Sequence, residues 1–289
     1  MSDWRHNLVS TDISEKYQKN NNMGIKKIIH IADIHIRLYK RHDEYRRVFK
    51  EFFDEIRDTG VDRIVIAGDI VHSKNQMTPE LISMVTYLLG GCAKIAKTII
   101  IPGNHDLLVN NLDRMDALSP IIEAMDNDNL VYYKDTSCHL DDNVVWCVYS
   151  QLDGNVRPQI ERAKLQHGFD KKYIGLYHDP IAGLITDVGF EFLDSTTVDI
   201  FDGLDYTLCG DIHRRQVLYT KDERPVIQVG SMIQQGFAES VMYHGYCIID
   251  IDVDNFSFKN LDYPTGFYTF EISSLDDIEN GGERILNYD

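Results

Sequence analysis

Five short apolar segments in this sequence each end in polar residues that can bind metal ions or carry protons. These residues follow the segments in the order Asp33-Ile34-His35, Gly68-Asp69, Gly103-Asn104-His105, His178-Asp179 and Gly210-Asp211-Ile212-His213. They offer carboxylate, amide and imidazole groups, and none of them offers a thiolate. Such a donor set suits a divalent cation of the manganese type better than a soft metal that prefers sulfur.

Seven of these side chains are candidate metal ligands, which is enough for two ions that share one ligand. The candidates are Asp33, His35, Asp69, Asn104, His178, Asp211 and His213. Two cations roughly 3.5–4 Å apart can hold a phosphoryl group, lower the pKa of a bound water and stabilise the leaving oxygen. The donor set therefore predicts the hydrolysis of a phosphate ester.

The segments that carry these residues predict a layered α/β fold. From Ile25 onward, short runs rich in Ile, Val and Tyr alternate with longer amphipathic stretches, which is typical of βαβ units. The predicted strands are 27–32, 63–67, 97–101, 144–149, 173–177, 206–209, 225–229 and 246–251. One predicted helix covers 43–58, and a second begins at Pro79 with Thr78 as its N-cap. Because loops at the carboxyl ends of such strands gather along one crevice, the candidate ligands are expected to meet there.

The five polar motifs resemble those of the calcineurin-like metallophosphoesterases, whose pattern is DxH, GD, GNH, a lone His and GHxH. The resemblance covers roughly residues 25–250, with all five blocks in order. It implies an α/β metallophosphoesterase fold, a four-layer sandwich of two central mixed β-sheets flanked by helices. It also implies two divalent metal ions, with Mn²⁺ expected and Mg²⁺ or another divalent ion as alternatives.

The same resemblance assigns a role to each motif residue. One ion would be held by Asp33, His35, Asp69 and His213, and the other by Asp69, Asn104, His178 and Asp211, with Asp69 bridging. His105 would be an acid that protonates the leaving oxygen or stabilises the transition state, and His72 would stabilise the phosphate. Histidine suits both roles because its ordinary pKa lies near neutrality.

Within the family, the sequence is most similar to SbcD-type DNA repair nucleases, the bacterial and phage counterparts of the eukaryotic Mre nuclease. His72 stands in Gly68-Asp69-Ile70-Val71-His72 where phosphatase branches read GDxxD, and residues 229–232, 237–239 and 245–246 resemble the segment that closes the nuclease core. This resemblance implies a DNA exonuclease and endonuclease subunit in recombination, repair or replication. It also implies DNA as substrate, an SbcC-type ABC ATPase as partner, and a homodimer within that complex.

Two features depart from the family pattern. Asp211 occupies a position where many members have histidine, and replacing an imidazole by an anion should favour a harder metal. The chain is also shorter than SbcD-like proteins, which continue into a capping domain. The expected organisation is a polar leader at 1–24, a metallophosphoesterase nuclease domain at 25–252, and a C-terminal β-rich edge or truncated capping segment at 253–289.

Composition limits the other functions of the chain. The formal net charge is −17, which argues against a broad basic surface for nucleic acid. The candidate DNA contacts are therefore local, and they are Arg37, Lys40, Arg41, Arg214 and Arg215. The alternative for the first three is a solvated face interleaved with acidic residues. Five scattered cysteines without CxxC spacing predict reduced thiols.

The chain is expected in the cytoplasm, or in the host cytoplasm if it is phage-encoded. It has no apolar run long enough to cross a membrane and no apolar stretch for a secretory signal. His30, His139, His167 and His244 lie outside any motif and are interpreted as structural or exposed. Asp106 either orients His105 or caps the following helix.

Two other functions stay open at this point. One is a phosphoesterase of the same fold that acts on a nucleotide, a cyclic nucleotide or a phosphoprotein, and His72 argues against it. The other is an inactive scaffold or DNA polymerase accessory subunit. The retained metal-binding side chains argue against that second function.

Overall fold

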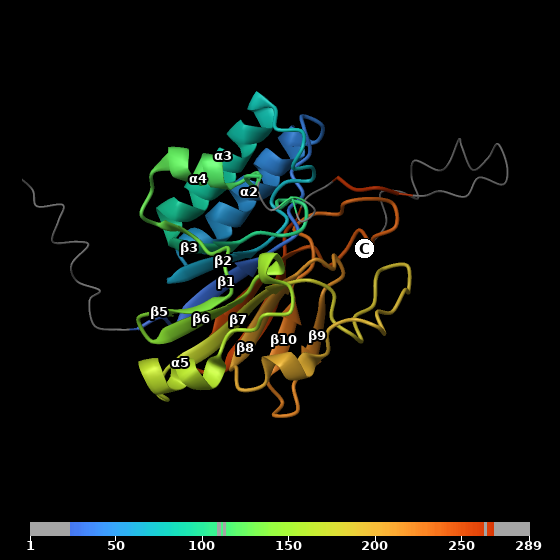
Figure 1. Cartoon of the computed structure of the whole chain (residues 1–289). Coiled ribbons are helices and arrows are strands. Elements are labelled where there is room, and N and C mark those ends of the chain that lie inside the picture. Colours follow the sequence, from blue (N-terminus) through green and yellow to red (C-terminus); the bar gives the residue numbers. More distant parts are fainter. Residues whose placement is uncertain (1–23, 109–110, 112–113, 263–264, 269–289) are drawn as a thin grey trace, which may run out of the picture.

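The computed structural model describes residues 24–108, 111, 114–262 and 265–268. Nearly all of the predicted leader lies outside these residues, as do 263–264 and 269–289 of the predicted C-terminal segment. Two six-stranded sheets pack face to face, with helices on their outer faces (Figure 1). The four-layer sandwich that the family resemblance implies is therefore confirmed.

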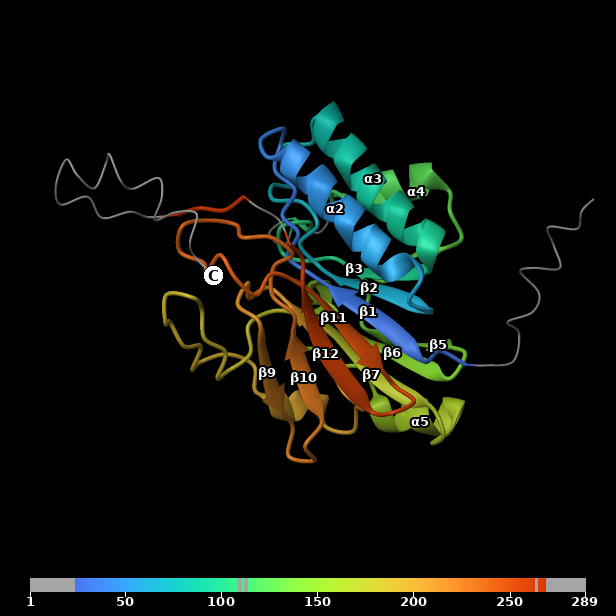
Figure 2. The ribbon, with the colours of Figure 1, turned by 180° about the vertical axis from the view of Figure 1, so that it is seen from behind.

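The first sheet has the strand order β12-β11-β1-β2-β3-β4. Its strands are β1 (Lys27–Ile31), β2 (Arg63–Ala67), β3 (Lys97–Ile101), β4 (Leu130–Tyr132), β11 (Gly245–Asp250) and β12 (Asn255–Asn260). Strands β1 to β4 are parallel, whereas β11 and β12 run antiparallel to their neighbours. Figure 2 shows β11 and β12 at the edge of this sheet.

The second sheet has the strand order β5-β6-β7-β8-β10-β9. Its strands are β5 (Ser137–Asp141), β6 (Val144–Tyr149), β7 (Lys172–His178), β8 (Tyr206–Gly210), β9 (Gln216–Tyr219) and β10 (Pro225–Gln228). The central strands are parallel and the two edge strands are antiparallel. Both sheets are thus mixed, and the parallel strands of each sheet end at the same edge of the molecule.

Helices α2 (His42–Arg57), α3 (Pro79–Ile95) and α4 (Ser119–Met125) cover the outer face of the first sheet, and α5 (Ile160–His167) covers the second. Short 3₁₀ turns occupy Gln151–Asp153 and Val198–Phe201. Helix α3 begins as predicted, because Thr78 Oγ1 accepts a hydrogen bond from the Leu81 amide at 3.3 Å and Pro79 is the first residue. Helix α2 buries an aromatic stripe that includes Phe49 and Phe52.

All eight predicted strands are confirmed, with ends that shift by at most a residue or so. Strands β4, β5 and β9 and helices α4 and α5 were not predicted. These elements are short, and β5 and β9 are edge strands whose side chains are mostly half-buried. Such elements carry too few buried positions to establish a period of 2 or 3.6.

Alternation along β1 builds the two cores on either side of the first sheet. Ile29 and Ile31 face the helices, whereas Ile28 and Ala32 face the second sheet. At the rim of the layer between the sheets, Arg63 donates to both oxygens of Asp141 at 2.7 and 2.9 Å. Burial raises the pKa of Asp141, but the hydrogen bonds from Arg63 and Trp146 and the charges of Arg63 and Lys97 together outweigh burial and hold that pKa at about 2.

His30 gives the packed sheets a pH dependence of their own. It is fully buried in β1 opposite Val65 and Cys247, and neither ring nitrogen has a partner among the described residues. Burial lowers the pKa of His30 to about 3. In the unfolded chain this ring would take up a proton near pH 6.5, whereas in the folded protein it stays neutral down to about pH 3. The free energy of unfolding is therefore unaffected by His30 above pH 6.5 and decreases as the pH falls from 6.5 toward 3.

We therefore expect His30→Leu to flatten the acid side of the stability profile. Between pH 7 and pH 5 the wild type should lose about 2 kcal/mol more unfolding free energy than the variant, since one pKa unit corresponds to about 1.4 kcal/mol. Urea unfolding of both proteins at several pH values measures this difference. Parallel profiles for the two proteins would contradict it.

Candidate active site

The candidate ligands lie where the parallel strands of both sheets end. Asp33 and His35 follow β1, Asp69 follows β2, and Asn104 follows β3; His178 ends β7, and Asp211 and His213 follow β8. Four of these residues have left-handed backbone conformations, with φ of 52° at Asp33, 48° at His35, 54° at Asp69 and 91° at Asp211. Such angles are unfavourable for residues other than glycine and cluster at functional sites. The backbone thus turns sharply just where each side chain enters the crevice.

Asp69 lies between the two halves of the ligand set. Its Oδ2 is 3.5 Å from His35 Nε2 and 3.3 Å from His178 Nε2. On one side, His35 Nε2 is 2.9 Å from His213 Nε2. On the other side, His178 Nε2 is 3.9 Å from Asp211 Oδ1. Asp69 therefore has the position of a bridging ligand.

The remaining two ligands join the same group. Asp33 shares one cluster with His35 and His213 and another with Asp69 and His178, in which the ligand atoms lie within 4.8 Å of one another. Asn104 Nδ2 lies 3.5 Å from Asp211 Oδ1. The structure thus brings together all seven residues that the sequence proposes as ligands.

The donor atoms fit divalent cations. Asp33 Oδ2, Asn104 Oδ1 and His178 Nε2 are buried without a hydrogen-bond partner among the described residues. Buried polar atoms are normally satisfied, so a group of unsatisfied ones at one point indicates an absent partner. Burial also raises the pKa of Asp33 to about 7 and raises that of Asp211. These carboxyl groups therefore favour a cation that restores their charged form.

Glycines make room for this group of side chains. A Cβ on Gly103 would lie 2.2 Å from Asp69 Oδ1 and 2.5 Å from His178 Nε2. A Cβ on Gly68, whose φ is +86°, would lie 2.3 Å from His178 Nδ1. Gly68 and Gly103 are thus required by the close approach of the ligands, which explains why the GD and GN motifs begin with glycine.

Two of the histidine ligands are oriented by hydrogen bonds from their other ring nitrogen. His178 Nδ1 donates to the Ala67 carbonyl at 2.6 Å, and His213 Nδ1 donates to Glu239 Oε1 at 2.6 Å. Each contact leaves Nε2 as the lone-pair nitrogen that faces the site. Such outer contacts fix the tautomer and the ring orientation of metal ligands.

Glu239 was not identified as a site residue from the sequence, although residues 237–239 resemble part of the segment that closes the nuclease core. It lies 26 residues from His213, and no motif links the two. Its Oε2 also accepts from the Gln235 amide at 2.7 Å, which holds the carboxylate in place. We expect Glu239→Gln to weaken Mn²⁺ binding by about 10- to 100-fold, because the orienting anion beside His213 is lost.

Calorimetric titration of Mn²⁺ into wild type and variant measures this loss. Glu161→Gln is a matched control, because Glu161 is a mostly exposed residue on α5 paired with Lys164. The control should bind Mn²⁺ as the wild type does. Equal affinities for Glu239→Gln and the control would contradict a positioning role.

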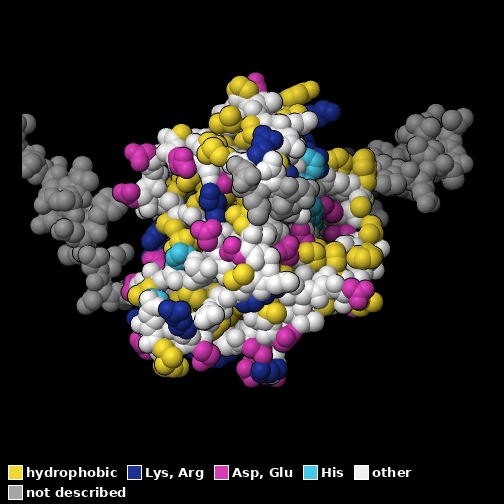
Figure 3. Space-filling model, viewed as in Figure 1, with side chains coloured by type: hydrophobic (Ala, Val, Ile, Leu, Met, Phe, Trp, Pro, Cys, Tyr) yellow, Lys and Arg dark blue, Asp and Glu magenta, His cyan; other side chains and the backbone are white. Residues whose placement is uncertain are grey.

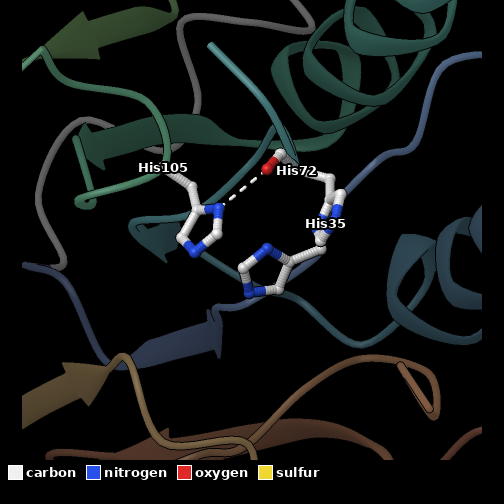
Figure 4. A group of neighbouring side chains, drawn as sticks. All are labelled: His35, His72 and His105. Carbon is white, nitrogen blue, oxygen red and sulfur yellow. Dashed lines mark hydrogen bonds between the residues drawn. The ribbon is translucent and has the colours of Figure 1, made fainter.

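The candidate ligand His35 lies in a group of three imidazoles with His72 and His105 (Figure 4). The ring centroids of His35 and His105 are 4.8 Å apart, and those of His72 and His105 are 5.6 Å apart. His105 Nδ1 donates to the His72 carbonyl at 2.7 Å. This contact leaves His105 Nε2 available to exchange a proton with a bound substrate.

Arg37 determines the tautomer of His72. Its Nη1 lies 2.9 Å from His72 Nε2, and a guanidinium can only donate, so this nitrogen of His72 accepts. Burial and then Arg37 lower the pKa of His72 to about 4. His72 is therefore a neutral ring with its proton on Nδ1, and that buried nitrogen has no partner among the described residues. It can donate a hydrogen bond to a phosphate oxygen.

Asp106 has a different role from the two that the sequence left open. Its carboxylate accepts hydrogen bonds from the amides of Ile70 (3.3 Å), Val71 (3.0 Å) and Gly103 (3.0 Å). It therefore ties the loop after β2 to the loop after β3. The His105 ring is oriented by the His72 carbonyl instead, and α4 begins only at Ser119.

The five basic candidates differ in their surroundings. Lys40 and Arg214 are exposed, and Arg37 contacts His72. Arg41 forms a two-point ion pair with Glu44 and donates to the Gln234 carbonyl, while Arg215 donates to Asn260 and stacks on Phe258. Arg37, Lys40 and Arg214 thus fit a substrate contact better than Arg41 and Arg215, and Arg214 lines a pocket together with Asp211 and His213.

Histidine and acidic side chains reach the surface together on the right side of the molecule in Figure 3. This fold and these groups of possible metal-binding side chains point to a hydrolase that uses metal ions. Residues 26–215 match the calcineurin-like phosphoesterase family. The chain belongs to that family and is a phosphoesterase of the metallophosphoesterase type.

Comparison with individual proteins adds one relative and two distant structures. The chain is 36% identical over 249 residues to the uncharacterized protein R555 of Acanthamoeba polyphaga mimivirus, a match that covers 82% of this chain and 18% of the relative. The chain therefore spans less than a fifth of the length of that relative.

Among the described helices, none is long and apolar enough to cross a lipid bilayer.

Two solved structures align with much of the chain at low identity. One is a dimetal phosphatase from Danio rerio, with a TM-score of 0.46, 12% identity, and coverage of 79% of this chain and 93% of that chain. The other is a purple acid phosphatase from yellow lupin (Lupinus luteus) seeds, with a TM-score of 0.46, 13% identity, and coverage of 68% and 40%.

Proposed function

We propose that this protein hydrolyses phosphodiester bonds in DNA with two divalent ions, as SbcD-like nucleases do. The observation that carries this proposal is the position of His72 and His105 beside the candidate ligand His35, with Arg37 hydrogen-bonded to His72. Two imidazole rings and a guanidinium next to a metal centre suit an anionic diester and its leaving oxygen. A carboxylate at position 72 would instead add negative charge beside the substrate.

The side chains of this protein divide the work of hydrolysis. Bound divalent ions would neutralise the phosphate and lower the pKa of the attacking water, with Asp69 shared between the two ion positions. His105 Nε2 would hold the proton that the leaving oxygen receives. His72 Nδ1 would donate to a non-bridging oxygen as charge develops there.

Manganese is the cation that we propose, with Mg²⁺ as the alternative. The ligands are carboxylate, amide and imidazole groups, and Asp211 adds an oxygen where many family members have a nitrogen. Carboxylate and carbonyl oxygens suit Mg²⁺ and Mn²⁺, whereas imidazole suits later transition metals such as iron and zinc. By the same resemblance, the protein would work as a homodimer with an SbcC-type ABC ATPase in the cytoplasm, or in host cytoplasm if a phage or virus encodes it.

Hydrolysis of labelled linear duplex and single-stranded DNA, with Mn²⁺ or Mg²⁺, tests this function. We expect cleavage of DNA and of bis-p-nitrophenyl phosphate, and little hydrolysis of a nucleotide monoester or a phosphopeptide. Intact DNA together with rapid hydrolysis of one of the last two substrates would favour the smaller-substrate alternative. Failure to bind Mn²⁺ in a calorimeter would favour an inactive scaffold.

A further inference from the structure

A pocket adjoins the candidate active site next to His72. It has a volume of about 360 Å³, which lies within the range of roughly 300–1,000 Å³ found for small-ligand pockets. Two segments form its walls. The polar and aromatic lining residues are Arg37, Tyr39, Lys40, His72, Ser73 and Gln76.

The lining of this pocket combines apolar, aromatic and cationic groups. Ile36 and Leu81 are buried, whereas the Tyr39 side chain is 67% exposed although it is large and aromatic. Arg37 and Lys40 flank Tyr39 in the sequence. In a chain with a formal net charge of −17, a cationic aromatic wall next to the candidate metal centre indicates an anionic ligand with a planar apolar part.

His72 connects the pocket with the ligand cluster. It lines the pocket, and its ring stands 5.6 Å from both the His35 and the His105 rings, centroid to centroid. Arg37 reaches from the pocket wall to His72 Nε2 at 2.9 Å and to the Gln235 carbonyl at 3.1 Å. A phosphate at the cluster and a group in the pocket would therefore lie on opposite sides of one imidazole.

We propose that this pocket holds an unpaired nucleobase of the substrate strand, from a nucleotide adjacent to the phosphate at the metal centre. Tyr39 supplies a stacking surface, the exposed Lys40 meets a backbone phosphate, and Arg37 adds positive charge to the pocket wall. Ser73 and Gln76 bring a hydroxyl and a carboxamide that can donate to and accept from base edges. This inference rests on the proposed function, because it specifies which part of a DNA strand the protein holds.

An unpaired base in this pocket determines the form of DNA that binds best. A base inside a duplex is stacked and paired, and its removal from the stack costs a few kcal/mol in general. Single strands and frayed ends already have free bases, so they should bind more tightly than a blunt duplex. The preference should not depend strongly on sequence, because every base has a face that stacks on an aromatic ring.

Fluorescence anisotropy of a labelled single-stranded oligonucleotide measures this contact without relying on turnover. In the presence of Ca²⁺, we expect Tyr39→Ala to weaken binding by about 10-fold, as loss of one base–aromatic stack does, and Tyr39→Phe to bind as the wild type does. Tyr219→Ala is the matched control, because Tyr219 is 53% exposed on β9 and does not line this pocket. It should leave binding unchanged.

Oligonucleotides with one abasic position, moved stepwise along the strand, locate the base. One abasic position should weaken wild-type binding as much as Tyr39→Ala does, and the two changes together should weaken it no further. If every abasic strand binds the wild type as the intact strand does, or if Tyr39→Ala binds normally, the pocket does not hold a base.

Hydrolysis of bis-p-nitrophenyl phosphate separates this inference from the proposed function. A wild type that cleaves DNA and this diester, with no effect of Tyr39→Ala on DNA affinity, would overturn the pocket assignment alone. A wild type that binds Mn²⁺ but cleaves neither substrate would overturn the proposed function. Circular dichroism of Tyr39→Ala and Tyr219→Ala verifies that both variants are folded.

Discussion

Asp69→Asn is expected to abolish phosphodiester hydrolysis, with a loss of at least about 10³-fold in kcat/KM. Loss of one well-placed electrostatic contact commonly costs about 10²- to 10³-fold, and Asp69 contacts both halves of the ligand set. Its Oδ2 lies within 3.5 Å of both His35 Nε2 and His178 Nε2. Asparagine has nearly the same shape, so the hydrogen bond from the His105 amide at 2.8 Å can persist.

Calorimetry and a control variant decide whether this loss comes from metal binding. Calorimetry should show that Asp69→Asn binds fewer than two Mn²⁺ ions with wild-type affinity. Asp54→Asn is a matched control on α2, where the carboxylate pairs with Lys50 at the surface, and it should keep wild-type activity and stoichiometry. Two ions bound normally by Asp69→Asn would contradict its bridging role.

His105→Ala is expected to reduce DNA cleavage by about 10²- to 10⁴-fold, the usual contribution of a positioned acid or base. The size of the loss should depend on the leaving group. A DNA diester expels an alkoxide that needs a proton, whereas p-nitrophenolate leaves well without one. Hydrolysis of bis-p-nitrophenyl phosphate should therefore fall much less than DNA cleavage.

Steady-state kinetics on both substrates tests this leaving-group dependence. His139→Ala is the control, because His139 lies in the edge strand β5, where its ring stacks on Tyr133, away from the ligand cluster. Mn²⁺ affinity should stay at the wild-type level in both variants. Equal losses on DNA and on the activated diester would show that His105 does not act as the acid.

Much of the fold could be predicted because its central strands are continuous apolar runs. Strands such as β2 and β3 are buried at four of five positions, and each is followed by a motif residue. Parallel strands must end at one edge, so strand order hardly affects which side chains meet. The meeting of the seven candidate side chains was therefore predictable without knowing that the strands divide between two sheets.

The supporting contacts were not predictable, since they join residues that no periodicity connects. Glu239 reaches His213 through a loop, and Gln151 Nε2 donates to the His178 carbonyl and to Asp179. The role of Asp106 depended on which amides the neighbouring loops turn toward it. The partners of long basic side chains were the hardest to predict, because Arg41 and Arg215 donate hydrogen bonds to residues far along the chain.

The division of the ligands between the two sheets has a consequence for folding. Asp33, His35, Asp69 and Asn104 follow strands of the first sheet, whereas His178, Asp211 and His213 come from the second. Besides the core between the sheets, hydrogen bonds join the two groups of ligands, such as the 2.8 Å bond from the Asp211 amide to the Asp33 carboxylate. A cation held by both groups would act as a clamp, and its binding energy would add to the cohesion of the halves. Removal of the metal by a chelator would then weaken the packing between the two sheets before it disturbed either sheet itself.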